Sequence, residues 1–164
     1  GKGRVMAAEI ERKFLVDTAL WQPPATGQQL SQGYLSLDPE RTVRVRIADA
    51  QAFLTIKGKT TGICRSEFEY AIPLADAAQL LTLCAIPPIE KTRYCIEYEG
   101  FVWEVDVFAG VNAGLVLAEI ELPDEQTPFA KPLWATQEVS HDKCYYNSYL
   151  NQHPYTTWSQ HEPQ

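Results

Sequence analysis

The sequence predicts a mainly β domain: an antiparallel sheet that curls into a barrel or sandwich, with a few helices packed outside it. Seven segments of the 164-residue chain alternate apolar and charged side chains with the period of a β-strand. Short turn-like stretches connect them, and only residues 73–85 have clear helical character. Many short strands joined by short turns are typical of barrels and sandwiches, so a single domain is expected.

The first strand is predicted at residues 9–16, EIERKFLV, where Ile10, Phe14 and Val16 form an apolar face. The opposite face of this strand carries Glu9, Glu11 and Lys13. Six further strands with one apolar and one charged face are predicted at residues 41–47, 53–59, 64–72, 90–99, 101–108 and 115–122.

The predicted helix at residues 73–85 is rich in Ala and Leu and is bounded by prolines on both sides. Two shorter helix candidates, at residues 129–135 and 142–150, follow the last strand. The domain is expected to span residues 6–151. The five residues GKGRV before Met6 are expected to be a cloning remnant, and the polar residues 152–164 a partly disordered C-terminal tail.

The composition is that of an ordinary soluble globular protein, with 45% hydrophobic and 21% charged residues. No apolar run reaches the length of a membrane span and no signal peptide is visible, so a cytoplasmic protein without a membrane partner is expected. The four cysteines have no metal-site spacing, and the three histidines cluster near the C-terminus. A net charge of −7 argues against a nucleic-acid partner.

The charged faces hold most of the cations of this acidic chain. Eight of its 14 Lys and Arg lie on them: Lys13, Arg44, Arg46, Lys57, Lys59, Arg65, Lys91 and Arg93. Carboxylates occur there in Glu-x-Glu or Glu-x-Asp pairs, and two side chains at i and i+2 of a strand point the same way about 7 Å apart. Such a pair can bind a hard divalent ion.

A solvated sheet face is the alternative explanation for these charges. Against it, the faces contain few Ser, Thr, Asn or Gln, and like charges such as Arg44/Arg46 and Glu119/Glu121 repel each other unless a counter-ion lies between them. Turned inward in a barrel, the charged faces would line a polar tunnel suited to a polyanion and a metal ion.

The charged strands resemble those of the CYTH superfamily, the triphosphate tunnel metalloenzymes. EIERKFLV is similar to the Glu-x-Glu-x-Lys first strand of that family. The resemblance continues in order through QGYL (32–35), VRVR (43–46), TIK (55–57), RSEFEY (65–70), EKTRY (90–94), WEVDVF (103–108), AEIEL (118–122) and EVSHDKCYYN (138–147). It implies an antiparallel eight-stranded barrel, closed or partly open, that binds triphosphates.

The resemblance also implies roles for individual residues. It implies a site for Mg²⁺, or alternatively Mn²⁺, with the metal ligands Glu9, Glu11, Asp106, Glu119 and Glu121. The phosphate-binding cations that it implies are Lys13, Arg44, Arg46, Lys57, Arg65, Lys91 and Arg93. This sequence departs from the family at Cys144, where an Arg or Lys is usual, and Cys144 is given no role.

The chemistry expected of this site is hydrolysis of a terminal phosphoanhydride, in which charge neutralisation and positioning matter most. Lys57 is the candidate general base, because neighbouring cations would lower its pKa, and Tyr34 is its candidate hydrogen-bonding partner. Lys57 as a plain phosphate contact and Tyr34 as a packing residue are equally open.

The expected substrate is a small-molecule triphosphate, with inorganic triphosphate first because the compact domain resembles the small bacterial triphosphatases. A class IV adenylate cyclase, or a thiamine or nucleoside triphosphatase, would use the same cations. A non-catalytic polyphosphate- or nucleotide-binding module is an alternative of another kind. A homodimer is expected if the barrel leaves strand edges open.

Overall fold

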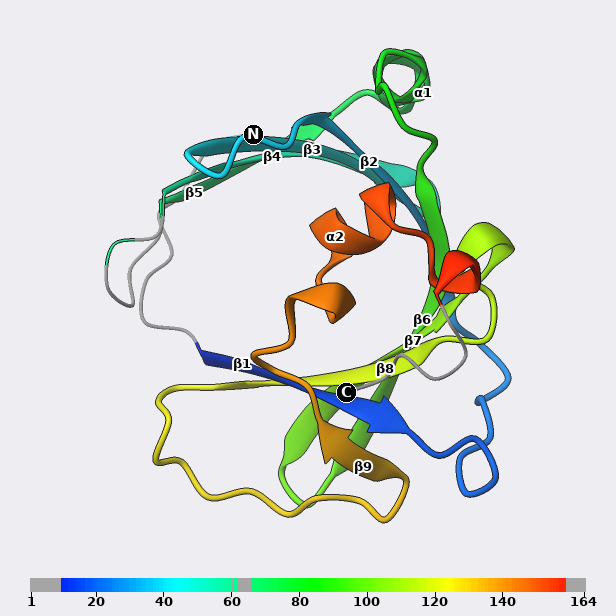
Figure 1. Cartoon of the computed structure of the whole chain (residues 1–164), viewed down its shortest axis with the longest axis vertical. Helices are drawn as coiled ribbons and strands as arrows, with labels where there is room; N and C mark the ends of the chain where they lie inside the picture. The colour runs from blue at the N-terminus through cyan, green and yellow to red at the C-terminus, as the bar shows by residue number, and fades with distance from the viewer. Residues whose placement is uncertain (1–9, 60, 62–65, 159–164) are drawn as a thin grey trace. The chain divides into compact units, whose positions relative to one another are not determined.

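The structure, a computed structural model, describes residues 10–59, 61 and 66–158 (Figure 1). Contacts between Cα atoms divide the chain into two compact units. Within its described part, the first unit comprises residues 29–90, and the second comprises residues 10–28 and 91–158. The described residues of the first unit thus come from one stretch of the sequence, whereas those of the second combine an N-terminal segment with the C-terminal half.

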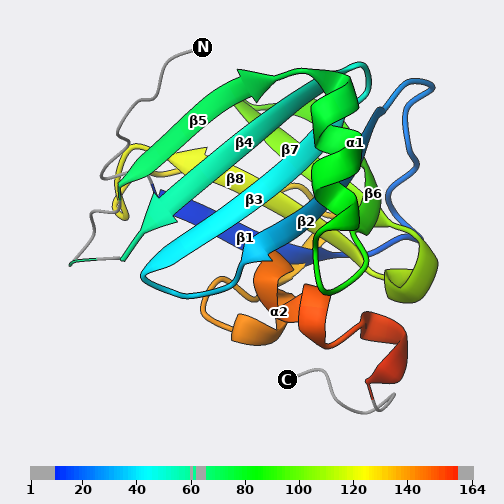
Figure 2. The same cartoon turned by 90° about the horizontal axis from the view of Figure 1, so that it is seen from above.

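The first unit is a four-stranded antiparallel sheet that carries one helix. Its strands follow one another along the chain: β2 (Gln28–Ser36), β3 (Arg41–Ala48), β4 (Gln51–Gly58) and β5 (Glu67–Ile72). Helix α1 (Leu74–Thr82) packs on β3 and β4 (Figure 2) and places Ala77 against Val45 and Ala52. A Cβ at Gly33 would come within 2.9 Å of Cys84 Sγ, so glycine lets the end of this helical segment approach β2.

The second unit is built on an antiparallel sheet with the strand order β6-β7-β8-β1-β9. The bounds of these strands are β6 (Ile89–Tyr98), β7 (Phe101–Phe108), β8 (Val116–Leu122), β1 (Ile10–Val16) and β9 (Ala135–Glu138). The turn between β6 and β7 consists of Glu99 and Gly100, which have φ values of 49° and 86°. Positive φ at both central residues is what a tight two-residue hairpin turn requires.

An aromatic core covers the apolar face of the second sheet. Phe14 of β1 and Trp103 of β7 lie 5.5 Å apart between ring centroids, and Phe129 and Trp134 pack on them from the segment that leads to β9. The helix predicted at residues 129–135 is not present, and that prediction is wrong. Pro128 and Pro132 each lack the N–H that a helix needs, and the chain there is irregular.

Three short helices follow β9. They are the 3₁₀ turn η2 (Lys143–Tyr145), helix α2 (Asn147–Gln152) and the 3₁₀ turn η3 (Tyr155–Thr157). The helix predicted at residues 142–150 is thus present but interrupted at Tyr146. The described part of the predicted tail is folded, because the Tyr155 N–H donates to Asn112 Oδ1 at 2.7 Å in the 3₁₀ turn η1 (Gly110–Asn112).

The predicted fold class, a mainly antiparallel β protein with few helices, is confirmed. The seven predicted strands correspond to seven observed ones, and sequence analysis missed β2 and β9. None of the helices among the described residues is both long enough and apolar enough to span a membrane.

Candidate functional site

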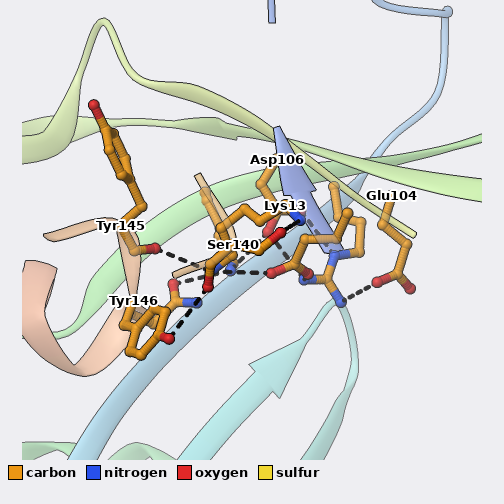
Figure 3. Close-up of polar contacts among 10 residues, drawn as sticks. Lys13, Glu104, Asp106, Ser140, Tyr145 and Tyr146 are labelled. Atoms are coloured by element: carbon orange, nitrogen blue, oxygen red, sulfur yellow. Dashed lines mark hydrogen bonds and ion pairs between the residues drawn. The ribbon is translucent and has the colours of Figure 1, made fainter. Parts of the chain in front are cut away.

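The sheet of the second unit brings charged residues from four strands onto one face. The strand register places Lys13 of β1 opposite Glu119 of β8, Glu104 of β7 opposite Glu119, and Arg93 of β6 opposite Asp106 of β7. Directly opposite side chains in antiparallel strands have Cβ atoms about 5 Å apart, so these groups can form a continuous network. Figure 3 shows the network.

Asp106 lies at the centre of this network. One of its oxygens is 2.8 Å from Lys91 Nζ, and its carboxylate accepts two hydrogen bonds from the Arg93 guanidinium at 2.8 and 2.9 Å (Figure 3). Burial alone would raise the pKa of Asp106, but the charges and hydrogen bonds of Lys91 and Arg93 hold it well below its usual range. Asp106 is therefore the charged partner of buried Lys91 and of half-buried Arg93.

Arg93 joins Asp106 to the other carboxylates. Its terminal nitrogens lie 3.4 Å from Glu104 Oε1 and 3.9 Å from Glu119 Oε1. Burial opposes the charge of Arg93, yet the hydrogen bonds and charge of Asp106 outweigh it and raise the pKa of the guanidinium above its usual value. Lys13 completes the row, with Nζ 3.2 Å from Glu119 Oε2.

The C-terminal segment also contacts the charged face, which sequence analysis did not foresee. Lys13 Nζ donates to the Tyr145 carbonyl at 3.0 Å, and Lys91 Nζ to Asn147 Oδ1 at 3.2 Å. Ser140 Oγ accepts the backbone N–H of Lys13 at 3.0 Å (Figure 3). The stretch EVSHDKCYYN contains Ser140, Tyr145 and Asn147. Its resemblance to the family could have indicated these contacts, but no role was predicted for these three residues.

The sheet of the first unit has a charged face of its own. Arg44 lies between Tyr34 and Thr55 in the strand register, and its guanidinium donates to Thr55 Oγ1 at 3.3 Å. Arg46 Nε donates to Gln32 Oε1 at 2.9 Å. Lys57 Nζ lies 3.6 Å from Glu67 Oε1. The cations predicted on this face are thus together, each with a polar or acidic neighbour.

Hard oxygen donors for a divalent cation are present on β1 and β8. Glu11 lies directly opposite Glu121, and Glu119 points to the same face two residues before Glu121. Within the described ranges no group of three or more His, Cys, Asp or Glu converges as a metal cluster. Mg²⁺ commonly takes only one or two carboxylates together with substrate phosphates and water, so a carboxylate pair fits this ion.

The sequence predicts thirteen residues at the site. In the second unit, the structure joins Lys13, Lys91, Arg93, Asp106 and Glu119 in one network and pairs Glu11 with Glu121. In the first unit, Tyr34, Arg44, Arg46 and Lys57 share one face. Glu9 and Arg65 lie outside the described residues. Cys144 lies in η2, where its backbone N–H donates to Asp142.

Comparison with known proteins identifies the family. The profile of the CYTH domain matches residues 7–148, which is most of the chain. The chain belongs to the CYTH domain family. Both charged faces described above fall within the matched region, as do all thirteen predicted site residues.

Two relatives in this family are named inorganic triphosphatases. The protein from Acetivibrio thermocellus is 47% identical over 156 residues, which cover 94% of this chain and 100% of that protein. The protein from Nitrosomonas europaea is 36% identical over 150 residues, which cover 87% and 95%. A crystal structure described as an inorganic triphosphatase matches with a TM-score of 0.69 and 33% identity, covering 90% of this chain and 97% of that one.

Proposed function

We propose that this CYTH protein is a triphosphatase that hydrolyses the terminal phosphoanhydride of inorganic triphosphate to pyrophosphate and phosphate. The observation that carries the proposal is the match over 94% of the chain, at 47% identity, to a protein named inorganic triphosphatase. Two charged sheet faces support it, because phosphoryl transfer depends on positioned positive charge rather than on a covalent intermediate.

The cations of the two faces would hold the phosphate chain. Arginine provides paired N–H donors that match phosphate oxygens, and lysine provides a compact charge. In the described structure Lys13 is bonded to Glu119 and the Tyr145 carbonyl, so a phosphate oxygen would compete with partners already present. Arg65, outside the described residues, is proposed as a further phosphate contact.

A divalent cation, Mg²⁺ or alternatively Mn²⁺, would be held by Glu11, Glu119 and Glu121 together with Glu9. When bound, it would neutralise phosphate oxygens and orient the attacking water. Asp106 is the least suited of the predicted ligands, because Lys91 and Arg93 already occupy both of its oxygens.

We also propose Lys57 as general base, with Tyr34 as its hydrogen-bonding partner. The oxygen of water attacks the terminal phosphorus, the anhydride P–O bond breaks with pyrophosphate as leaving group, and a proton of the water passes to Lys57 Nζ. If so, the pH–rate profile has an alkaline-side ionisation that disappears in Lys57→Met. An unchanged ionisation would leave Lys57 as a phosphate contact only.

The first test is phosphate release from tripolyphosphate, ATP and thiamine triphosphate, with Mg²⁺ and with EDTA. We expect rapid release from tripolyphosphate that needs the metal and falls roughly a hundredfold or more in Glu11→Gln. Glu125→Gln makes the same charge change at an exposed turn and should retain full activity. No release from any of the three would refute the triphosphatase, and cyclic AMP formed from ATP would show a cyclase instead.

A further inference from the structure

The side chain of Gln32 on β2 contains a buried donor without a partner. Gln32 is 0% exposed, and its Oε1 accepts a hydrogen bond from Arg46 Nε at 2.9 Å. Its Nε2 has no hydrogen-bond partner among the residues that the structure describes. Arg46 can only donate, so Oε1 must face it, and the orientation of the amide is therefore fixed by chemistry.

A second buried donor lies on the neighbouring strand. Arg44 Nε likewise has no hydrogen-bond partner in the described part of the chain, although the same guanidinium donates to Thr55 Oγ1. Gln32 is opposite Arg46 and Tyr34 is opposite Arg44, so Gln32 and Arg44 are diagonal neighbours on one face. The third such atom among the described residues, Trp103 Nε1, belongs to the aromatic core of the other unit.

The two unpaired atoms are both hydrogen-bond donors, and this indicates what kind of ligand would bind them. Buried polar atoms nearly always have a hydrogen-bond partner, because leaving one unpaired is costly. Here both unpaired atoms are N–H donors on a face that also carries Arg46 and Lys57, so the missing partner is rich in acceptor oxygens and negatively charged. A phosphate chain meets this description.

We propose that Gln32 is a further substrate-binding residue, whose Nε2 donates to a phosphate oxygen of the bound triphosphate while its Oε1 holds Arg46 in place. The inference rests on the proposed function and adds a residue to it. Gln32 lies in the QGYL stretch, of which only Tyr34 had a predicted role.

A neutral hydrogen-bond donor differs from the cations in how salt affects its interaction with a phosphate. The attraction between a cation and a phosphate weakens as salt screens it, whereas a buried amide hydrogen bond is screened little. Gln32 would therefore contribute to triphosphate binding at any ionic strength, and its loss would leave the salt dependence of binding unchanged.

The direct test is the ¹⁵N–¹H spectrum of the side-chain amides of the full chain, titrated with tripolyphosphate in EDTA. The Gln32 resonances are assigned by their absence in Gln32→Glu. We expect them to shift on binding together with the Nε–H signals of Arg44 and Arg46. If the arginine signals shift and the Gln32 signals do not, triphosphate binds without Gln32 and this inference alone is wrong. If no signal shifts, both it and the proposed function fail.

Two substitutions separate the roles of the two amide atoms. Gln32→Glu keeps an acceptor for Arg46 but removes the donor, and Gln32→Met removes both without adding charge. We expect both to weaken tripolyphosphate binding by about tenfold or more in calorimetry. Gln51→Glu adds the same charge at the exposed start of β4 and should bind like the wild type. Weakening in the Met variant alone would mean that Gln32 acts only through Arg46, and weakening in the Glu variant alone would mean a charge effect. Either result overturns the proposal.

Discussion

At the scale of single residues, Asp106 determines whether two cations on β6 can be buried. Lys91 is 0% exposed at its side chain, and Arg93 is 13% exposed. A buried charge is tolerated only with a partner, and Asp106 is within 2.8 Å of both cations. Because its pKa is held below the usual range, Asp106 contributes this stabilisation above the ordinary aspartate pKa and loses it only in strong acid.

We predict that Asp106→Asn lowers the free energy of unfolding by about 3–5 kcal/mol, because it removes the carboxylate that neutralises buried Lys91 and is the nearest counter-charge of Arg93. Urea denaturation measures this loss. Glu104→Gln is the matched control: Glu104 also contacts Arg93 but is 36% exposed at its side chain, so its loss should cost about 1 kcal/mol or less. Equal losses in the two variants would contradict the central position of Asp106.

The same residues show what the sequence could predict about the site. The period of two put Lys13, Arg93, Asp106 and Glu119 on charged faces, and in the structure ion pairs join these four in one network. The contacts of Lys13 with the C-terminal segment could not be predicted from the period of two. Periodicity shows which face of a strand a residue lies on, but not which distant segment packs against that face. Gln32 was given no role, because the sequence does not show that its side chain is buried beside Arg46.

At the scale of elements, a polar cluster ties the segment after β9 to β1. The Arg12 guanidinium donates to both oxygens of Glu138, at 2.6 and 2.9 Å, and Ser140 Oγ donates to Glu138 while accepting the Lys13 N–H. The hydrogen bond from Arg12 is the main cause that lowers the pKa of Glu138 to about 2, against a smaller opposing effect of burial. The cluster therefore joins the C-terminal segment to the strand that carries Lys13.

We predict that Glu138→Gln destabilises the protein at neutral pH and that this difference from the wild type disappears in acid. A carboxylate whose pKa is lowered on folding stabilises the protein above its unfolded pKa, here about 4.5, and loses that effect as the pH falls through about 2. Unfolding free energies of both proteins between pH 7 and pH 2 measure it. A difference that stays constant over this range would mean that Glu138 acts through shape and not through charge.

Strands were predictable where apolar and charged side chains alternate along the sequence. The predicted strand at residues 101–108 has the bounds of β7, and apolar and charged residues alternate through its centre from Trp103 to Val107. β2 was missed because Ser31 and Gly33 interrupt the alternation with small residues. The segment at residues 129–135 was predicted as a short helix, whereas Phe129 and Trp134 pack on Trp103 from an irregular chain.

At the scale of the whole molecule, the two units differ in the sequence separation of their paired strands, and therefore in how fast those pairings are expected to form. Every strand pairing within the first unit joins neighbours in sequence, such as β3 and β4, which are separated by a two-residue turn. The second unit depends on β1 and β8, where Ile10 pairs with Leu122. Closing such a long loop costs more entropy before any contact is gained, so pairings between distant segments form more slowly.

We therefore predict that, in pulse-labelled refolding, amides of β3 and β4 become protected before those of β1 and β8. The cations Arg44, Arg46 and Lys57 would then be in place while Glu11 still lacks its opposite carboxylate, Glu121. If the proposed metal site needs this pair, triphosphatase activity returns with the slower phase, when β1 joins β8. Simultaneous protection of all four strands would mean that the two units fold as one cooperative body. Activity that returned with the fast phase would place the catalytic carboxylates elsewhere than on β1 and β8.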